Sequence, residues 1–350
     1  MMRVGVLAME WPRLGRHSGG VGRYILRLVE ALREDVQFTV YCLDTPELID
    51  GVQFRTLPSD GQFSRYYGVP LAVRPLIRAA EHDVVHAHGD DWALLGARVP
   101  VLRTVYGLSY WEARTSHGLR RWNHWLQAGL EEVAVRTADL AVAIGLDSSE
   151  HFRIPILPPA ITKREVAFST DHPRKEARAV FVGTFDGRKQ GWLALRAAER
   201  LRQAGFAFTV FGPDADRARY PAWVDFTSEA SDNEVWETLR LAKVLLAPST
   251  YEGFGIPMWE AMANGCYVVA LPTPGSRFLL QDSGVGTEGT TPEAFLLAVD
   301  KYLTLDSAQV HSLAVVAALR AKEVLAQSSP SRYLDLYRRL AESGSRARQQ

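Results

Sequence analysis

The chain has 350 residues, of which 47% are hydrophobic and 23% charged, a composition typical of a globular protein with about two domains. Its 40 Lys and Arg residues balance its 40 Asp and Glu residues, which excludes the global positive field of a nucleic-acid-binding protein. No run approaches about 18 apolar residues, so we expect no membrane-spanning helix, and the short apolar start predicts a strand and not a signal peptide. Cys42 and Cys266 stand far apart in segments predicted as strands, which indicates reduced, buried thiols in a cytoplasmic protein.

The first half of the chain alternates between short β-rich runs and helical stretches. Residues 3–8 predict a strand, a glycine loop follows at residues 18–22, and an amphipathic helix continues to about residue 33. Further strands, with helices between them, are predicted over residues 38–42, 52–57, 83–87, 101–105 and 140–144. Such alternation is typical of a parallel sheet that helices cover on both faces.

This alternation breaks between about residues 154 and 178, where proline, polar and charged residues predict a linker and the start of a second domain. It then resumes, with strands and helices predicted over residues 179–182, 191–203, 206–211, 244–247 and 267–271 and a helix after Pro257. The last stretch predicts one more helix, followed by a frayed tail over the final eight residues. The fold class is therefore α/β, with two doubly wound units whose ligands are expected at the carboxyl ends of the strands.

The segment over residues 248–270, PSTYEGFGIPMWEAMANGCYVVA, carries the strongest functional pattern. Gly253 and Gly255 stand between a predicted strand and a predicted helix, and the helix is expected to end at an Asn-Gly pair. Backbone N–H groups at such a helix start favour a phosphate. Glu252 and Glu260 flank this anion site, and carboxylates suit sugar or ribose hydroxyls, whose hydrogen bonds they accept.

The Glu-x7-Glu spacing within EGFGIPMWEAMANG resembles the signature of family 4 retaining glycosyltransferases, which have the GT-B fold of two facing Rossmann-like domains with a cleft between them. Other stretches that resemble the family are DVVHAH, FVG followed by a lysine, and SDNEVWETLRLAKVLLAPSTYEGFG, so the resemblance covers nearly the whole chain. It implies an acceptor-binding domain over residues 1–165, a nucleotide-sugar-binding domain over residues 166–328, and a final helix in residues 329–350 that crosses back to the first domain.

The resemblance also implies roles for individual residues. Glu252 would hold hydroxyls of the donor sugar, and Glu260 would hold the ribose diol of the donor. The acceptor is expected to meet first-domain loops at about residues 59–70 and 107–120. The donor is expected to lie along a set of largely backbone positions: Gly19, Gly20, Gly183, Gly253, Phe254, Gly255 and Ile256.

Two further loops are expected to meet the donor diphosphate. The first, HSGGVGR at residues 17–23, has three glycines that let the backbone approach a ligand closely. The second, FVGTFDGRKQGW at residues 181–192, contains Lys189, which we identify with the lysine of the family. Thr184 stands where relatives usually carry an arginine, so we expect Arg188 to replace the missing charge and to clamp the leaving diphosphate together with Lys189.

Five side chains of the first domain complete the analysis. His86 and His88 share one face of a predicted strand, and because no third ligand follows at a suitable spacing, we expect a packed or acceptor-side role and not metal binding. Tyr106 stands where many relatives have a histidine that touches the donor sugar, which leaves the contacts to that sugar open. Trp122 and Trp125 fit one face of a long helix, and we assign them no function.

We therefore predict a retaining hexosyltransferase that moves a hexose-type sugar from a UDP- or GDP-linked donor to a saccharide or small-molecule acceptor. No metal and no other cofactor is predicted, because helix N-termini and basic side chains stabilise a leaving diphosphate. Two alternatives stay open: a nucleotide-sugar epimerase of the same fold, and a non-catalytic member that only binds nucleotide sugar. The base, the sugar, the acceptor, the oligomeric state and any contact with a membrane surface also stay open.

Overall fold

The computed structural model describes residues 1–15, 19–58, 61, 64–89, 91–96, 98–115, 118–160, 175–228, 230–281 and 289–349. The chain divides into two compact units. The first comprises Met1–Lys163 together with Ser328–Gln350, and the second comprises Arg164–Gln327. The predicted junction at residues 165–166 lies outside the described residues.

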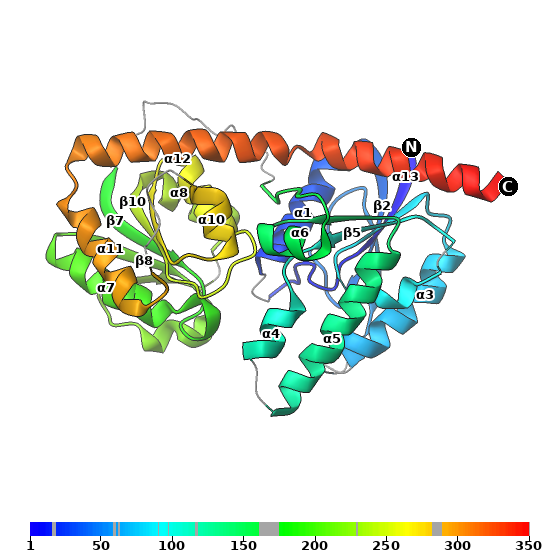
Figure 1. The fold of residues 1–350 in the computed structure, drawn as a ribbon, viewed down its shortest axis with the longest axis horizontal. Helices are drawn as coiled ribbons and strands as arrows, with labels where there is room; N and C mark the ends of the chain where they lie inside the picture. Colours follow the sequence, from blue (N-terminus) through cyan, green and yellow to red (C-terminus); the bar gives the residue numbers. More distant parts are fainter. Residues whose placement is uncertain are drawn as a thin grey trace. The chain divides into compact units, whose positions relative to one another are not determined.

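Within the described part of the chain, the first unit is built on a six-stranded parallel sheet of order β3-β2-β1-β4-β5-β6 (Figure 1). Its strands are β1 (Met2–Leu7), β2 (Val36–Leu43), β3 (Gln53–Leu57), β4 (Val84–Ala87), β5 (Val101–Val105) and β6 (Leu140–Ala143). The predicted strands of this unit are therefore confirmed, with small shifts at their ends. β1, β2, β4, β5 and β6 are mostly apolar and buried, as expected for a parallel sheet covered on both faces, whereas the edge strand β3 (QFRTL) is largely exposed.

The helices of this unit follow the strands in alternation. They are α1 (Gly20–Leu32), the π-helical turn η1 (Ser64–Gly68), α3 (Val69–Ala79), the 3-10 turn η2 (Trp92–Leu94), α4 (Ser109–Thr115), α5 (Gly118–Thr137), α6 (Leu146–Phe152) and α13 (Pro330–Gln349). The glycine loop predicted at residues 18–22 is too long, because α1 already begins at Gly20 and takes Gly22 into its first turn. Glycine tolerates helical angles as readily as loop angles, so its presence did not fix this boundary.

The last helix, α13, packs against α1, β4 and β5 of the first unit. The prediction of a frayed tail was wrong, since α13 continues to Gln349. Gly344 explains part of this difference: a Cβ atom there would stand 2.5 Å from Cγ of Pro100. The glycine therefore allows the helix to lie close to Pro100 and does not end the helix.

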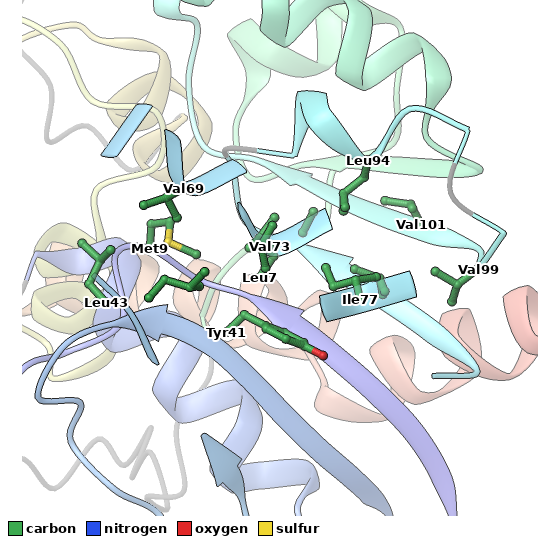
Figure 2. Packing of buried hydrophobic residues seen from close by; sticks show 13 residues of the cluster. Leu7, Met9, Tyr41, Leu43, Val69, Val73, Ile77, Leu94, Val99 and Val101 are labelled. Carbon is green, nitrogen blue, oxygen red and sulfur yellow. The ribbon is translucent and has the colours of Figure 1, made fainter. Parts of the chain in front are cut away.

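A hydrophobic core between the sheet and α3 fixes β1, β2 and β4 in place (Figure 2). Val69, Val73 and Ile77 recur every four residues along α3 and form its buried stripe. They pack against Leu7 of β1 and Tyr41 of β2, among others. Burying each of these aliphatic side chains contributes about 1.5–3 kcal/mol. The core thereby sets the positions at which β1 and β4 end.

The second unit has, in its described residues, a five-stranded parallel sheet of order β11-β10-β7-β8-β9. Its strands are β7 (Glu176–Val182), β8 (Ala207–Phe211), β9 (Asp225–Thr227), β10 (Ala242–Ala247) and β11 (Tyr267–Ala270). β7 begins inside the stretch predicted as linker, because pairing with β8 and β10 orders its charged first residues. β9 was not predicted, since three residues carry too little pattern to identify a strand.

The helical segments of this unit are η3 (Gly187–Lys189), α7 (Gly191–Gln203), η4 (Asp214–Arg219), α8 (Asp232–Leu241), α9 (Ile256–Ala263), α10 (Pro274–Leu280), α11 (Pro292–Thr304) and α12 (Ser307–Gln327). The predicted end of α9 is confirmed. The N–H of Gly265 donates to the carbonyl of Met262 at 3.0 Å, and the N–H of Cys266 donates to the carbonyl of Ala261 at 2.8 Å. This pair of bonds is a Schellman motif, which satisfies carbonyls at a helix end.

Cys42 and Cys266, both among the described residues, are buried and form no disulfide. Burial raises the pKa of both thiols to about 12, which keeps them protonated.

None of the helices in the described ranges combines the length and apolar content that crossing a membrane requires.

Candidate active site

The loop that joins β10 to α9 forms the centre of the candidate site. Gly255 precedes the first residue of α9 and has a φ angle of 88°, in the left-handed region that favours glycine. A Cβ atom at this position would stand 2.1 Å from Cε of Met258. The carbonyl of Gly255 accepts hydrogen bonds from the N–H groups of Met258 and Trp259. Glycine therefore lets the loop turn directly into α9.

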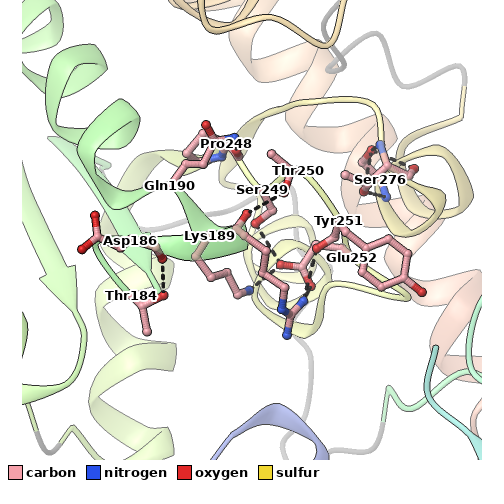
Figure 3. Close-up of polar contacts among 12 residues, drawn as sticks. Thr184, Asp186, Lys189, Gln190, Pro248, Ser249, Thr250, Tyr251, Glu252 and Ser276 are labelled. Carbon is pink, nitrogen blue, oxygen red and sulfur yellow. Dashed lines mark hydrogen bonds and ion pairs between the residues drawn. The ribbon is translucent and has the colours of Figure 1, made fainter. Parts of the chain in front are cut away.

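Glu252 lies in this loop with only 7% of its surface exposed, and three side chains bind its carboxylate (Figure 3). Nζ of Lys189 lies 2.5 Å from Oε1, and Oγ of Ser249 donates to the same oxygen at 2.9 Å. Nη1 of Arg188 lies 3.4 Å from Oε2 and also donates to the carbonyl of Tyr251 at 3.2 Å. The structure thus brings the three predicted catalytic residues together.

Hydrogen bonds hold η3, which carries both cations, against this loop. Nε2 of Gln190 donates to the carbonyl of Pro248 at 2.8 Å, and the N–H of Thr250 donates to the carbonyl of Arg188 at 2.8 Å. Gly183 leaves room for the lysine, because a Cβ atom there would stand 3.0 Å from Cβ and Cγ of Lys189. The predicted donor-binding glycine at position 183 therefore positions Lys189.

The charge of Glu252 follows from its surroundings. Burial by itself would raise the pKa of this carboxyl, but the charges of Lys189 and Arg188, with hydrogen bonds from Lys189 and Ser249, outweigh it. The net effect holds the pKa of Glu252 below its ordinary value. The carboxylate is therefore ionised at neutral pH and can accept hydrogen bonds only.

A small cavity of about 10 Å³, enough for about one water molecule, lies beside these residues. Its polar lining is Lys189, Ser249 and Glu252, and its remaining wall is mainly apolar, from β7, β10 and the start of α9. A ligand group at this position would meet a cation, a carboxylate and a hydroxyl on an otherwise apolar surface.

Other predicted donor-binding residues contribute in different ways. Glu260 lies in α9 and is buried, at 6% exposure. Phe254 is a core residue, with its ring 6.1 Å from that of Phe278. Its side chain therefore packs in the core, and its predicted contact with the donor would be made by its backbone. Gly253 is buried in the loop, and Ile256 is the first residue of α9.

Three residues of this site were missed in the sequence. Gln190 and Ser249 make the bonds given above, and Gly275 of α10 donates its N–H to the carbonyl of Glu252 at 2.7 Å. A Cβ atom on Gly275 would stand 2.4 Å from the carbonyl oxygen of Phe254, so α10 also needs glycine there. Ser249 stands three residues before Glu252, and this Ser-x-x-Glu spacing was a usable sign of a hydrogen bond.

Thr184, the position at which the resemblance to the family predicts an arginine, makes local contacts. Thr184 is exposed and donates its hydroxyl to the carbonyl of Asp186 at 2.9 Å. Asp186 in turn pairs with Arg219 at 2.8 Å. Thr184 therefore caps its own turn, and Arg188, not Thr184, supplies positive charge beside Glu252.

In the first unit, the glycine pair predicted to face the diphosphate lies at the start of α1. Gly19 is the N-cap of this helix, and no described atom lies within 4 Å of the place where its Cβ would stand. Gly20 is the first helical residue, and both glycines are exposed. His17 and Ser18, which precede them, lie outside the described residues.

His86 and His88 belong to a buried network that includes α13. His86 is hydrogen-bonded through Nδ1 to the hydroxyl of Tyr337 at 2.7 Å and through Nε2 to Oγ1 of Thr104 at 2.8 Å. Burial lowers its pKa to about 3, so it is neutral. Nδ1 of His88 lies 2.5 Å from the hydroxyl of Tyr106.

The hydrogen bonds of this network involve both ring nitrogens of His86 but only one ring nitrogen of His88. Both ring nitrogens of His86 are used in packing, so the packed interpretation holds for it. Burial, and then the neighbouring His86, lower the pKa of His88, and burial raises that of Tyr106. Among the described residues Nε2 of His88 is buried without a hydrogen-bond partner.

Asp91, which follows His88 in the chain, is bound to an arginine. Asp91 is buried and pairs with the buried guanidinium of Arg103, while Asp90 lies outside the described residues. Across the part of the chain that the structure describes, no three His, Cys, Asp or Glu side chains gather as a metal ion would require.

Comparison with known proteins decides the family. The family model described as Glycosyltransferase Family 4 matches residues 18–153, and the model described as Glycosyl transferases group 1 matches residues 162–313. The two matches follow one another along the chain and together cover most of it. The chain belongs to family 4 of the glycosyltransferases.

This glycosyltransferase is similar to the phosphatidyl-myo-inositol mannosyltransferase of Mycolicibacterium smegmatis, with 26% identity over 318 residues that cover 81% of this chain and 80% of the relative. Its fold is similar to that of sucrose-phosphate synthase from Thermosynechococcus elongatus, with a TM-score of 0.79 and 17% identity over 98% of this chain and 100% of that one. It is also similar to HepE of Anabaena, solved in complex with UDP-glucose, with a TM-score of 0.70 and 14% identity over 99% and 100% of the two chains. The structural matches establish the GT-B fold.

Membership of this family also bears on the alternatives drawn from the sequence. The family and the relatives described above are named for transfer or synthesis, so the chain is a transferase, and the epimerase alternative is set aside. The roles of individual residues in this glycosyltransferase stay predictions.

Proposed function

We propose that this glycosyltransferase takes its sugar from a nucleoside diphosphate sugar, a UDP- or GDP-linked hexose, bound by the second unit beside the start of α9. The transfer retains the configuration of the sugar, needs no metal ion, and uses a saccharide or small-molecule acceptor. The observation that carries the proposal is the contact between Lys189 and Glu252 beside the start of α9. The UDP-glucose complex of HepE, which has the same fold, supports this donor class.

The contact between Lys189 and Glu252 fits the chemistry of such a donor. In a nucleoside diphosphate sugar, the anomeric carbon of the sugar is bonded to a phosphate oxygen. The negative charge of the diphosphate and the hydroxyls of the sugar ring are therefore close together. When the donor binds, the ion pair separates: Lys189 turns to the diphosphate, and Glu252 accepts hydrogen bonds from sugar hydroxyls. Without the donor, each partner neutralises the other and keeps Glu252 ionised.

Positive charge is needed most as the glycosidic bond breaks. The diphosphate then gains negative charge, and cations aimed at it stabilise the transition state. Lys189 and Arg188 supply this charge, together with backbone N–H groups at the start of α9. Arg188 has 54% of its side chain exposed and lies 3.4 Å from Glu252, so turning towards a phosphate costs it little. These groups take the role that a metal ion has in other transferases.

The remaining predicted residues keep the roles that the sequence indicates. Glu260 holds the ribose diol, for which a buried carboxylate on α9 is suited because each hydroxyl can donate to it. Gly19 and Gly20 offer backbone at the start of α1 to a phosphate. His88 and Tyr106 are assigned to the acceptor or sugar side.

A donor screen tests this proposal. The melting temperature of the purified protein is measured with UDP-glucose, UDP-galactose, GDP-mannose and a nucleoside monophosphate sugar, because a ligand at 100 times its Kd stabilises the folded state by about 2.7 kcal/mol. We expect a nucleoside diphosphate sugar to raise it in the presence of EDTA. The same donor should then transfer its sugar to an acceptor with its configuration retained, as NMR of the product reports.

The control for this screen is Lys189→Ala, which should lose much of the shift. Stabilisation by the monophosphate sugar alone would contradict the donor class. Transfer that EDTA abolishes and magnesium or manganese restores would contradict the metal-free mechanism.

A further inference from the structure

The outward face of α5 is apolar, although it belongs to a helix on the surface of the first unit. Trp122 is 75% exposed, Trp125 39%, Leu126 55% and Val133 44%. These residues recur at helical spacing along one stripe, about 16 Å long at 1.5 Å per residue. An ordinary surface helix exposes polar side chains on this face. The expectation that these tryptophans need no functional role is therefore not supported by their exposure.

The neighbouring helix α4 extends this stripe. α4 packs on α5, and the ring of its Tyr110 lies 5.2 Å from the ring of Trp125. Trp111 is 42% exposed, and the guanidinium of Arg114 lies 5.7 Å from its ring centre and 5.4 Å from that of Tyr110. We call the surface formed by Trp111, Trp122, Trp125, Leu126 and Val133 the tryptophan face.

Charge around the tryptophan face is positive. Residues 111–130 of the sequence contain three arginines, Arg114, Arg120 and Arg121, and one acidic residue, Glu112. The side chains of Arg114 and Arg121 are exposed. The acidic residues that follow on α5 already have basic partners: Glu131 pairs with Arg103 at 3.7 Å, and Glu132 pairs with Arg136 at 2.5 Å.

We propose that the tryptophan face binds the surface of an anionic lipid bilayer, with α5 lying in the plane of the headgroups. Tryptophan favours this boundary, because its ring is largely apolar and its N–H needs a polar partner. Arg114 and Arg121 reach the lipid phosphates, and anionic lipid adds a favourable electrostatic contribution. The proposal concerns where the enzyme binds and does not rest on the proposed donor.

A second copy of the chain fits this face less well. In a twofold symmetric dimer the same patch meets itself, so the exposed arginines of one copy would approach those of the other. Residues 111–130 contain only one acidic residue, Glu112, against three arginines. A bilayer that contains anionic lipid satisfies both the apolar stripe and its positive charge.

Vesicle co-sedimentation tests this proposal. The full chain is mixed with phosphatidylcholine vesicles, with and without phosphatidylglycerol, and the bound fraction is measured at low and high salt. Two double variants, Trp122→Ser with Trp125→Ser and Arg114→Gln with Arg121→Gln, remove the apolar and the charged contribution. The matched control is Leu297→Ser with Leu319→Ser, which removes side chains that are 66% and 54% exposed on α11 and α12.

We expect the wild type to bind vesicles that contain phosphatidylglycerol, less so at high salt. The tryptophan variant should lose about tenfold in partitioning for each side chain removed. The arginine variant should lose roughly 30-fold on anionic vesicles. The control should bind as the wild type does. The melting temperature of every variant is measured as well, because Trp125 packs on Tyr110 and is only 39% exposed.

Three results would overturn the proposal. The wild type could fail to bind anionic vesicles, or the tryptophan variant could bind them as well as the wild type does. The third is a wild type that is dimeric by analytical ultracentrifugation and a tryptophan variant that is monomeric, with no vesicle binding by either. That result would make the face an interface between copies.

Discussion

Replacing Glu252 by glutamine keeps the shape of the side chain and removes its charge. We expect Glu252→Gln to bind free UDP or GDP more tightly than the wild type does, while its turnover of the complete donor falls. The reason is competition: in the ligand-free protein, Glu252 occupies Lys189 and Arg188, the two cations that the diphosphate needs. The free nucleotide has no sugar hydroxyls to offer Glu252 in exchange.

The structure sets the size of the gain in affinity. Nζ of Lys189 lies 2.5 Å from Oε1 of Glu252. A phosphate oxygen bonded to the opposite side of the ammonium, at about 2.8 Å, would lie about 5 Å from the carboxylate. Two unit charges at this separation repel by about 3 kcal/mol at an effective dielectric constant of about 20. The side chain of Lys189 is 20% exposed and that of Arg188 54%, so we halve the repulsion energy to account for screening by water. Removing the remaining repulsion should make nucleotide binding about tenfold tighter.

Turnover should change in the opposite direction. An amide accepts a weaker hydrogen bond than a carboxylate, and losing a bond to a charged group costs about 1.5–3 kcal/mol, or roughly 10- to 100-fold in rate. Isothermal titration with UDP and GDP measures the first effect, and single-turnover transfer measures the second. Ser249→Ala is the control, because it removes one hydrogen bond from Glu252 and leaves the charge. Equal or weaker nucleotide binding by Glu252→Gln would refute the competition.

Three other predictions follow from the same site. Lys189→Ala should lower turnover on the order of 100-fold. Arg188→Ala should do so only if Arg188 replaces the missing arginine. Near-wild-type turnover of Lys189→Ala on the same donor would refute the prediction that Lys189 clamps the diphosphate. Glu260→Ala should weaken nucleoside diphosphate binding by about 1.5–3 kcal/mol in titration calorimetry, and unchanged affinity would refute the ribose assignment. Because the pKa of Glu252 is lowered by folding, its ionisation stabilises the fold above its ordinary pKa, and this contribution is lost as the pH falls through the lowered value. Denaturant unfolding across that pH range should therefore show the stability difference between the wild type and Glu252→Gln shrinking towards acid pH, and a constant difference would contradict the pKa shift.

Much of the local structure follows from the sequence. The limits of α7 match the predicted residues, and the Asn-Gly end of α9 forms the expected Schellman motif. The spacing of Glu252 and Glu260 around two glycines was sufficient to indicate the family that the comparisons establish. These features depend on residues close together in the chain, where backbone preferences and hydrophobic periodicity act directly.

Other features depended on residues far apart in the chain. Gly344 looks like a helix end in sequence but lies against Pro100, so α13 continues past it. Trp122 and Trp125 fit the pattern of a packed helix face, but α5 buries its opposite side, at His124, and leaves the tryptophans exposed. Periodicity shows that a helix has an apolar face and does not show which element, if any, covers it.

The contact of Glu252 with Lys189 and Arg188 also depends on residues that are far apart in the chain. Sequence by itself determined which residue types were present: a carboxylate in a glycine loop and two cations in another loop, each after a strand of a parallel sheet. Only the tertiary structure decided that Lys189 and Arg188 meet Glu252 across 63 and 64 residues of sequence. The sheet order places β7 beside β10, so the loops that follow these two strands come together at one edge. Strand order depends on packing of the whole unit, which no local pattern encodes.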